Sequence, residues 1–508
     1  MNPVMADEFR RLGVDPGDVE GLLRLAAAGS IDTPGPLGPV MAAATDLLHN
    51  RPNEWGALFL RLFSPPNYAF PDPPVSPAAR LFALPPNDAV DSVSRLPNAL
   101  LGSIVSCLPV KDAARTAALS RRWRGVWRSA PLVLADADLL PDTSAVSSVL
   151  AAHPGPFRCI HLTSSRMPEF HGLLTRWLQL LADKGIQELV LVNRRSPLDF
   201  ALPATFFGMK TLTRLCLGLW KFPDTAGLPR ATCFPNLREL ELCNVLVKSR
   251  DLDFILDRSP VLEILRVQAN LFKLRLRLVS QSIRDVHLFT SCIEEIFVVD
   301  APRLEQLVHA EAWTYDDICT KVKIGHAPEL RFLGFLNPKN HVLEFGNTII
   351  KAGTRASPST MIPSVTLLGM EVCFEVRNDA KMIPSVLRCF PNAEMLYILS
   401  RKTDQSAGKL NVKFWHESGT IECIQSRIKQ LYIRDFHGGR SELAFLKFFF
   451  ESALVLEEVV IMLDPGFTSM KEVHSKVESL GSMKRASEAS SVLVTACSDA
   501  QGGYSRSF

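Results

Sequence analysis

The sequence lacks the features that mark secreted and membrane proteins. Its first residues, Met1 to Arg11, contain two acidic side chains and have no apolar core, so they do not read as a secretory signal. The longest apolar stretch, Leu443 to Leu463, includes four charged residues and is too charged to span a bilayer. We therefore expect a protein of the cytoplasm or the nucleus that does not engage membranes.

Motifs of the common enzyme classes are also missing. The sequence contains no GxxxxGKS/T phosphate-binding loop, no GxGxxG turn, no HExxH zinc pair and no GxSxG nucleophile elbow. Its 11 histidines occur singly, and its 11 cysteines include no CxxC pair, so the cysteines are expected to be reduced and buried. We expect no catalytic residues, no metal site and no cofactor.

An excess of one charge is absent as well. The 56 Lys and Arg residues nearly balance the 53 Asp and Glu residues, for a formal net charge of +3. This balance argues against a dedicated nucleic-acid-binding protein, whose domains usually carry a clustered basic excess. Hydrophobic residues make up 47% of the 508 residues, which excludes wholesale disorder. The length allows roughly three to four domains.

Proline, with 35 residues, outnumbers glycine, with 28, and helps to divide the chain. Residues 1–63 read as short helices and are interpreted as a helical N-terminal region of unknown role. Residues 64–90 follow as a Pro-rich linker, because proline removes backbone donors and disfavours helix. At the other end, residues 479–508 are rich in Ser, Ala and Gly and are expected to be a disordered tail.

A leucine repeat extends over residues 157–400. The pattern LxxLxL recurs, and its central leucines, Leu189, Leu215, Leu240 and Leu265, are separated by 26, 25 and 25 residues. This period is typical of leucine-rich repeats, which are ~20–29 residues long. Because strand residues alternate between two faces, one unit can bury its leucines only against neighbouring units. The pattern predicts a curved solenoid of parallel strands and helices, with an ordinary α/β domain as the alternative.

Later repeats are weaker and less regular. They occur at residues 283–288, 293–298, 393–398, 428–433 and 456–461. Asparagines suited to turns follow some strands, at Asn193, Asn244 and Asn270. The irregular stretch from Asn337 to Met361 is expected to be disordered, with a recognition loop as the alternative. Charged residues expected to face solvent on the concave strands are Glu188, Arg214, Glu239, Glu241 and Arg266.

A compact helical patch occupies residues 91–130. Between Pro97 and Pro109 the apolar residues fall on one helical face: Leu100, Leu101, Ile104, Val105 and Leu108. Asp112 is expected to cap a second helix and Ser120 a third, which carries two tryptophans one turn apart among four arginines. Three short helices cannot build a stable core of their own, so the patch needs a partner surface.

This patch resembles the F-box motif over its whole length. The matching residues, in order, are Leu96-Pro97, Ile104 with Leu108-Pro109, Lys111-Asp112, Arg115-Thr116, and Leu119-Ser120-Arg121-Arg122-Trp123-Arg124 with Trp127. The ending is similar to that of a large plant group of F-box proteins with leucine-rich repeats. Residues 91–131 are therefore interpreted as an F-box, and residues 157–400 as its repeat solenoid.

A second resemblance lies near the C-terminus, in residues 411–465. This segment contains Trp415-His416-Glu417-Ser418-Gly419, Phe436-His437-Gly438-Gly439 and Leu456-Glu457-Glu458-Val459. Together these residues look like the FBD module of the same plant group. The two resemblances imply an α/β protein with a small three-helix F-box, an irregular leucine-rich-repeat solenoid and an FBD-like C-terminal region.

The family resemblance implies a non-catalytic adaptor role. F-box proteins bind a Skp-type adaptor, which links them to a cullin–RING ubiquitin ligase, and their other domains select a client protein for ubiquitination and proteasomal turnover. An apolar helical surface in a groove is a recurrent recognition mode. The residues expected to contact the adaptor are Leu96, Pro97, Leu100, Leu101, Ile104, Leu108, Val110, Leu119, Trp123 and Trp127. Val110 and Trp127 could instead close the F-box's own core, and the client and its contact residues stay unknown.

Two other functions are compatible with the sequence. The chain could be a repeat-based protein-binding scaffold that acts outside a ligase. A less favoured alternative is nucleic-acid binding by Arg121 to Arg128, where arginines alternate with tryptophans, and residues 91–130 carry seven basic and two acidic side chains. We favour the interpretation in which the arginines form a solvated helix face and the tryptophans pack inward, so that no nucleic acid is bound.

Overall fold

The computed structural model describes residues 93–139, 145–165, 171–193, 200–270, 272–310, 319–402, 411–464, 485–487 and 490–496. The described chain forms two compact units. The first extends to Lys273 and includes residues 290–292, and the second comprises residues 274–289 and the described residues from Ile293 onward. The predicted N-terminal helical region, 1–63, and the Pro-rich linker, 64–90, lie outside the described residues.

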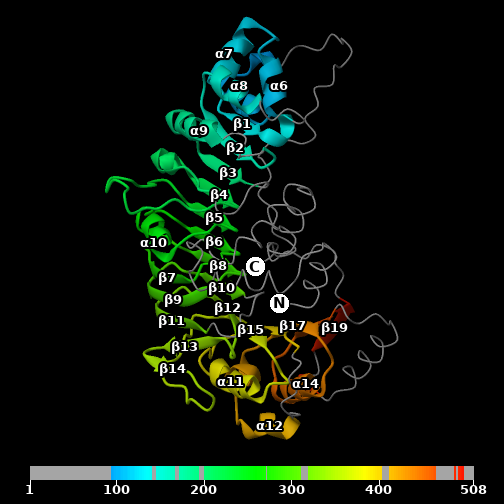
Figure 1. Cartoon of the computed structure of the whole chain (residues 1–508). Helices are drawn as coiled ribbons and strands as arrows, with labels where there is room; N and C mark the ends of the chain where they lie inside the picture. The colour runs from blue at the N-terminus through cyan, green and yellow to red at the C-terminus, as the bar shows by residue number, and fades with distance from the viewer. Residues whose placement is uncertain are drawn as a thin grey trace, which may run out of the picture. The chain divides into compact units, whose positions relative to one another are not determined.

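The first unit begins with short helices and continues as a series of parallel strands (Figure 1). Its helices are η1 (Val93–Arg95), α5 (Asn98–Ser106), α6 (Val110–Thr116), α7 (Arg121–Ser129), η2 (Asp136–Leu139), α8 (Ala145–Ala152), α9 (His171–Asp183), η4 (Ala204–Gly208) and α10 (Ser249–Asp257). Its strands are β1 (Leu132–Ala135), β2 (Phe157–Leu162), β3 (Glu188–Val192), β4 (Arg214–Gly218), β5 (Glu239–Cys243) and β6 (Ile264–Gln268).

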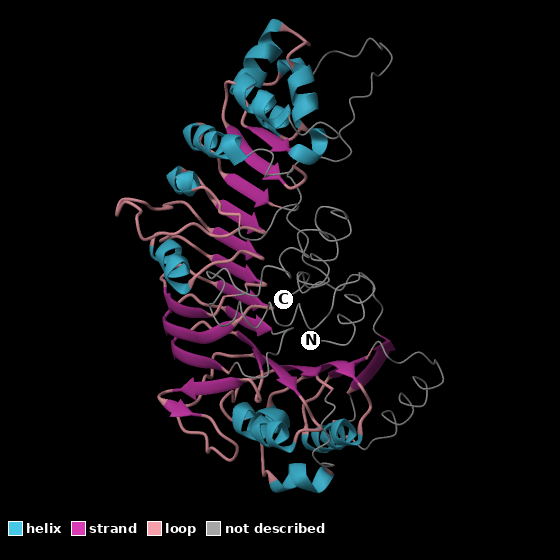
Figure 2. Ribbon diagram, viewed as in Figure 1, coloured by secondary structure: helices cyan, strands magenta, loops and turns pink. Residues whose placement is uncertain are grey.

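The leucines of successive repeats lie side by side in this parallel sheet. Leu189 pairs with Leu215, Leu215 with Leu240, and Leu240 with Leu265, and none of the four is exposed. Figure 2 shows the helices between these strands on one side of the sheet, and the other side carries no described helix. The predicted solenoid of parallel strands and helices is confirmed.

The turns after these strands have left-handed backbone, and a hydrogen bond joins two of them. Leu219, Asn244 and Ala269 follow β4, β5 and β6 with positive φ values of 63°, 53° and 52°. Asn270, one of the three predicted turn asparagines, accepts a hydrogen bond from the backbone N–H of Val247 at 3.0 Å through its side-chain oxygen. This bond ties the turn of one repeat to the turn of the next.

Compared with the first unit, the second unit contains more strands and fewer helices. Its strands are β7 (Leu274–Val279), β8 (Asp285–Phe289), β9 (Ile293–Asp300), β10 (Gln306–Ala310), β11 (Thr320–His326), β12 (Phe332–Leu336), β13 (His341–Phe345), β14 (Thr348–Ile349), β15 (Leu367–Val372), β16 (Met395–Ser400), β17 (Gln430–Phe436), β18 (Glu458–Leu463) and β19 (Ser491–Ala496). Its helices are α11 (Arg377–Leu387), α12 (Val412–Glu417), α13 (Glu422–Ser426) and α14 (Arg440–Ser452).

These strands form two sheets. The order in the first is β8, β10, β12, β15, β16, β17, β18 and β19, all parallel, and the second contains β7, β9, β11 and β13 with the antiparallel β14 at its edge. The sequence of β7, a strand of the second sheet, accounts for its strand conformation. Leu274, Leu276 and Leu278 are buried and alternate with exposed residues. This period of two is typical of a strand. The predicted weak repeat at 293–298 therefore forms a strand of the second sheet.

The prediction of disorder for Asn337 to Met361 is wrong. The segment contains β13 and β14, which form an antiparallel pair in which Phe345 is aligned with Thr348. Asn337 begins the segment with a turn, in which its side-chain oxygen accepts hydrogen bonds from the backbone N–H groups of Lys339 and Asn340. His341, Leu343 and Phe345 are buried and alternate with half-buried residues, so burial of one face stabilises β13.

The predicted disordered tail, 479–508, also contains ordered structure. Strand β19 pairs in parallel with β18 along its whole length, from Ser491 opposite Glu458 to Ala496 opposite Leu463. The segment before it is fixed to the same module, since Ser487 donates a hydrogen bond to the Leu456 carbonyl at 2.6 Å. The prediction of disorder rested on the Ser, Ala and Gly content of the whole tail. Residues 491–496 within it read SVLVTA, a run with high β propensity.

Candidate functional site

The three helices of the predicted F-box begin where the sequence places its helix-starting residues. Pro97 and Pro109 occupy the N-cap positions of α5 and α6, with φ values of −58° and −54° that suit entry into a helix. Ser120 caps α7 as predicted and accepts a hydrogen bond from the backbone N–H of Trp123. Asp112 is not the cap of α6. It lies in the first turn, where its carboxylate pairs with Arg115 at 2.7 Å.

The helices enclose a small apolar core. Its main members are Leu101, Val105, Val110, Trp123 and Val126, which are at most 8% exposed. Leu101, Val110 and Trp123 were all predicted to contact the adaptor. Their side chains face the interior of the F-box, so they stabilise the F-box and have little surface left to offer a partner. Trp127 is half-buried, so its burial does not decide between contact with the adaptor and closing of the F-box core.

The other predicted contact residues present apolar surface to solvent. Leu100 is 52% exposed, Ile104 is 42% exposed and Leu119 is 66% exposed. Pro97 is also exposed, and Leu96 and Leu108 are half-buried. Leu100 and Ile104 stand one helical turn apart on α5, on the same side of the helix. We use the term F-box apolar patch for Pro97, Leu100, Ile104 and Leu119.

Val93 is an exposed apolar residue that the sequence analysis missed. It is 48% exposed in η1 and its carbonyl accepts a hydrogen bond from the Leu96 backbone N–H at 3.1 Å. It lies within the predicted F-box, 91–131, just before Leu96-Pro97, where the resemblance to the motif begins. Its position immediately upstream of Leu96-Pro97 was the signal that could have found it.

The F-box is attached to the first repeats by specific contacts. Helices α5 and α6 both pack against β1, the first strand of the sheet. Within the F-box, Arg122 of α7 donates hydrogen bonds to the Leu96 carbonyl and, at 2.8 Å, to the side-chain oxygen of Asn98, which joins α7 to the start of α5. The ring of Trp127 contacts the edge of His153, which follows α8, with 5.2 Å between ring centroids. The packing on β1 and the contact between Trp127 and His153 hold the F-box and the first repeats in one unit.

Two further buried side chains stabilise this region, His153 at the junction itself and Asp136 between the ends of β1 and β2. His153 forms a 3.1 Å hydrogen bond with the Ala130 carbonyl, and burial lowers the pKa of its ring below the ordinary value. Asp136, directly after β1, is fully buried, and its carboxylate accepts hydrogen bonds from the backbone N–H groups of Ser164 and Ser165 at 2.7 to 3.1 Å. Neither residue belongs to a recognisable motif, so only the structure reveals them.

The arginines of α7 form the solvated face that the sequence analysis favoured. Arg121, Arg124 and Arg128 are exposed, whereas Trp123 is only 8% exposed and points into the F-box core. A nucleic-acid platform combines basic residues with aromatic faces that are free to stack on bases. Trp123 offers no such face, and the ring of Trp127 is in contact with His153.

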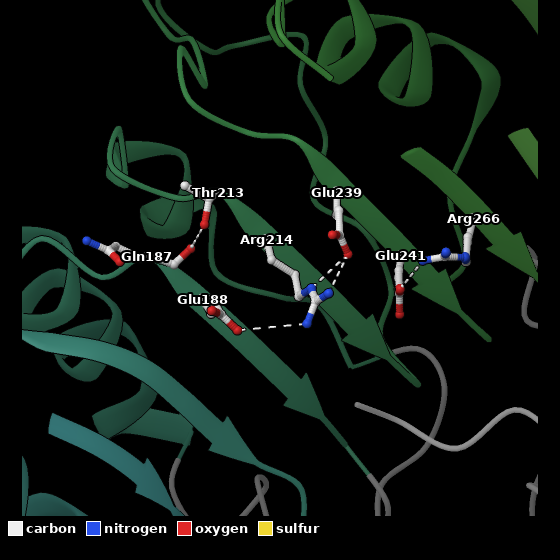
Figure 3. A network of polar contacts seen from close by, with 7 residues as sticks. All are labelled: Gln187, Glu188, Thr213, Arg214, Glu239, Glu241 and Arg266. Carbon is white, nitrogen blue, oxygen red and sulfur yellow. Dashed lines mark hydrogen bonds and ion pairs between the residues drawn. The ribbon is translucent and has the colours of Figure 1, made fainter. Parts of the chain in front are cut away.

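A ladder of charged side chains crosses the strands of the repeats (Figure 3). Arg214 of β4 pairs with Glu239 of β5 at 2.7 Å and lies 3.9 Å from Glu188 of β3. Beside it, Arg266 of β6 pairs with Glu241 of β5 at 2.6 Å. The sequence placed all five residues on one strand face, but the expectation that they are exposed to solvent is wrong for Glu241, which is buried, and the other four are half-buried. The sequence did not show that they pair with one another, nor that the Glu241 side chain is only 8% exposed.

The FBD-like segment has its own aromatic core and a buried carboxylate. Trp415 is fully buried and contacts the edge of Phe445, with ring centroids 5.1 Å apart. Glu442 of α14, which is 5% exposed, accepts hydrogen bonds from the Ser400 hydroxyl at 2.5 Å and from the Gly439 backbone N–H at 2.7 Å. The neighbouring Glu442 carboxylate raises the pKa of His437 above its ordinary value. These interactions fix the start of α14 to the ends of β16 and β17.

The described residues bear on metal binding and on the reactivity of two buried cysteines. Within the ranges that the structure describes, no group of three or more His, Cys, Asp or Glu side chains could hold a metal ion. Burial raises the pKa of the Cys389 thiol to about 11 and that of Cys423 to about 12, which disfavours the reactive thiolate. No helix in the described part of the chain is both long and apolar enough to cross a membrane.

Three family models match this sequence, in the order that the structure shows. The F-box domain model matches residues 93–134, a model described as "FBD-associated F-box protein At5g56370, LRR repeats" matches residues 174–398, and the FBD model matches residues 416–461. The repeat model spans parts of both units, and the FBD model covers α13, β17, α14 and most of β18.

Similar proteins from Arabidopsis thaliana have an F-box and leucine-rich repeats in their names, and two of the following three also have an FBD. "F-box/FBD/LRR-repeat protein At5g22660" is 25% identical over 419 residues, covering 74% of this chain and 90% of the relative. "F-box/FBD/LRR-repeat protein At1g13570" is 23% identical over 389 residues, covering 74% and 91%. "F-box/LRR-repeat protein At3g26922" is 28% identical over 278 residues, covering 52% and 81%. With an F-box match, a leucine-rich-repeat match and an FBD match in this order, the chain has the same domain combination as these F-box/FBD/LRR-repeat proteins.

Proposed function

We propose that this protein is the substrate-recognition subunit of an SCF-type (Skp–cullin–F-box) ubiquitin ligase in the cytoplasm or nucleus. The F-box binds a Skp-type adaptor, and the repeats bind a client protein that is then ubiquitinated and degraded by the proteasome. The chain itself catalyses no step. The F-box domain and the repeats support this role, and the observation that carries it is the F-box apolar patch.

The patch is suited to a partner because the F-box is complete without it. Leu101 and Trp123 fill the core, while Leu100, Ile104 and Leu119 remain between 42% and 66% exposed. Burying one such side chain in an interface contributes about 1.5–3 kcal/mol. Losing two of them therefore weakens the adaptor contact by about 3 kcal/mol or more, which is at least about 100-fold in Kd. The exposed residues, rather than the whole predicted set, are the ones we assign to the adaptor.

Because the F-box packs against the first repeats, an adaptor bound to the F-box is held in a fixed orientation relative to those repeats. A ligase of this kind accelerates ubiquitin transfer by holding a client lysine near the charged conjugating enzyme, which raises its effective concentration. A flexible F-box would weaken that effect. The packing of α5 and α6 on β1 and the contact of Trp127 with His153 support a fixed direction between adaptor and the first repeats.

The experiment is co-purification of the full-length protein with a Skp-type adaptor and a cullin. We expect the wild type to retain both, and the double variant Leu100→Asp/Ile104→Asp to lose both. Leu173→Asp is the matched control, because Leu173 is 41% exposed on α9, outside the F-box. Absence of both proteins from a folded wild-type sample would favour the alternative of a scaffold that acts outside a ligase.

A further inference from the structure

Strand β19 is the last strand of the larger sheet of the second unit, and among the described residues no strand covers its outer edge. Its inner edge pairs with β18 from Ser491 to Ala496. In the first unit, by contrast, helices α5 and α6 pack against the edge strand β1. An uncovered edge presents a row of backbone N–H and C=O groups to another chain.

The sequence of β19 contains nothing that discourages pairing at this edge. The strand reads SVLVTA, without a charged residue and without proline. Leu493 is 57% exposed, and Val492 and Val494 are half-buried. Natural edge strands commonly carry lysine, proline or a bulge, which prevents association with other strands. The register of β19 against β18 contains no bulge.

The backbone of β19 fixes which residues can pair outward. The Ser491 N–H donates to the Glu457 carbonyl at 2.9 Å, so the backbone groups of Ser491 face β18. Because these groups alternate along a strand, those of Leu493 also face β18, and those of Val492 and Val494 face the outer edge. The backbone N–H and C=O groups that face the outer edge therefore belong to Val492 and Val494, one residue on each side of Leu493.

We propose that this edge pairs with the same edge of a second copy of the protein, antiparallel and about a two-fold axis at Leu493. In that register Val492 of each copy exchanges two hydrogen bonds with Val494 of the other, and the two Leu493 residues form the central pair without hydrogen bonds. The sequence Ser-Val-Leu-Val-Thr reads almost the same in both directions, so its pattern matches itself. Such self-complementarity is what a two-fold interface requires.

The side chains agree with this register. Residues directly opposite in an antiparallel pair lie on the same face of the sheet, so Leu493 meets Leu493 of the second copy on one face. Val492 meets Val494 of the second copy on the other face. The contact is small compared with the ~1,200–2,000 Å² of stable interfaces, so we expect a weak, reversible dimer. A dimer presents two F-boxes and two repeat surfaces together, which increases avidity for a client with repeated motifs.

Cysteine trapping tests the register directly. In a central pair without hydrogen bonds the Cα atoms are about 4.5 Å apart, which is within disulfide range. We expect Leu493→Cys to form a covalent dimer on mild oxidation, with the two introduced cysteines joined in the peptide map. Leu454→Cys is the control, because Leu454 is 63% exposed just before β18 but not on β19. Equal dimer yields from the two variants would overturn the proposal.

Sedimentation equilibrium of the full-length protein provides the second test. We expect the average mass of the wild type to rise toward that of a dimer with concentration, and Leu493→Glu, which opposes two carboxylates, to stay monomeric. A wild type that stays monomeric, or a Leu493→Glu variant that associates equally well, contradicts the proposal. The adaptor-binding variant Leu100→Asp/Ile104→Asp should still dimerise, so failure of this inference and failure of the proposed function give different results.

Discussion

The indole of Trp127 and the imidazole of His153 meet edge to face, with 5.2 Å between their ring centroids. Trp127 belongs to the last helix of the F-box, and His153 precedes the second strand of the repeats. His153 is 1% exposed and also contacts the ring of Phe157. The end of the F-box is thus packed against the beginning of the solenoid through a titratable residue.

The first prediction concerns the pH dependence of this junction. Burial lowers the pKa of His153, so the unfolded chain takes up a proton near the ordinary value of about 6.5 while the folded chain takes it up only at lower pH. Stability should therefore fall as the pH drops below about 6.5. In His153→Phe, which keeps a ring but cannot titrate, this part of the loss should disappear. Thermal unfolding of both proteins at about pH 7.5 and pH 5.5 measures the difference, and equal losses would contradict the assignment.

The second prediction separates the core of the F-box from its surface. Leu101→Ala leaves a cavity in the core and should lower the free energy of unfolding of the first unit by about 2–5 kcal/mol. Ile104→Ala, one turn away and 42% exposed, should change it by about 0.5 kcal/mol or less. Denaturant titration of the two variants measures both values. Similar losses would show that Ile104 also supports the core.

Part of this architecture was predictable from the sequence, because local patterns carry it. The 25-residue spacing of Leu215, Leu240 and Leu265 identified aligned strands, and the Leu96-to-Trp127 string identified the F-box. Patterns of this kind report which residues are apolar and how they repeat. They do not report which of two apolar neighbours faces inward when both fall on one helical face.

Long-range contacts account for what the sequence could not show. Leu100 and Leu101 are adjacent and equally apolar, yet one is 52% exposed and the other 0%, because α6, α7 and β1 cover only one of them. Strand β19 was missed for a related reason. Its six residues are stabilised by pairing with β18, which lies about thirty residues earlier in the chain, and not by local composition.

The third prediction concerns the charged ladder. In the sheet register, position 214 lies directly between Glu188 and Glu239, so Arg214→Glu places three carboxylates in a row. We expect a loss of about 1–2 kcal/mol of stability at low salt, because like charges opposite one another repel, and a smaller loss at high salt. Arg214→Gln is the matched control, since it removes the pair without adding a negative charge. Chemical unfolding at two salt concentrations distinguishes them, and a salt-independent loss would count against direct repulsion.

The fourth prediction concerns His437 in the FBD. Glu442 raises the pKa of His437, and the Asp464 carboxylate lies 3.3 Å from its other ring nitrogen. A raised pKa means that the folded chain holds the proton to higher pH than the unfolded chain does. The stabilisation is complete below the ordinary pKa of about 6.5 and is lost as the pH rises through the raised value. His437→Gln should therefore cost more stability at about pH 5.5 than at about pH 8.5. Thermal unfolding at both values checks this, and a cost that is larger at high pH would reverse the sign and contradict the account.

The most direct test of the central claim is the affinity of the purified full-length protein for a purified Skp-type adaptor. Isothermal titration should give saturable binding by the wild type and by Leu173→Asp. For Leu100→Asp/Ile104→Asp we predict a Kd at least about 100-fold weaker, since two lost apolar contacts remove about 3 kcal/mol or more. The double variant should keep the wild-type circular dichroism spectrum and melting temperature. Wild-type affinity in a folded Leu100→Asp/Ile104→Asp protein would show that the F-box apolar patch is not the adaptor-binding surface.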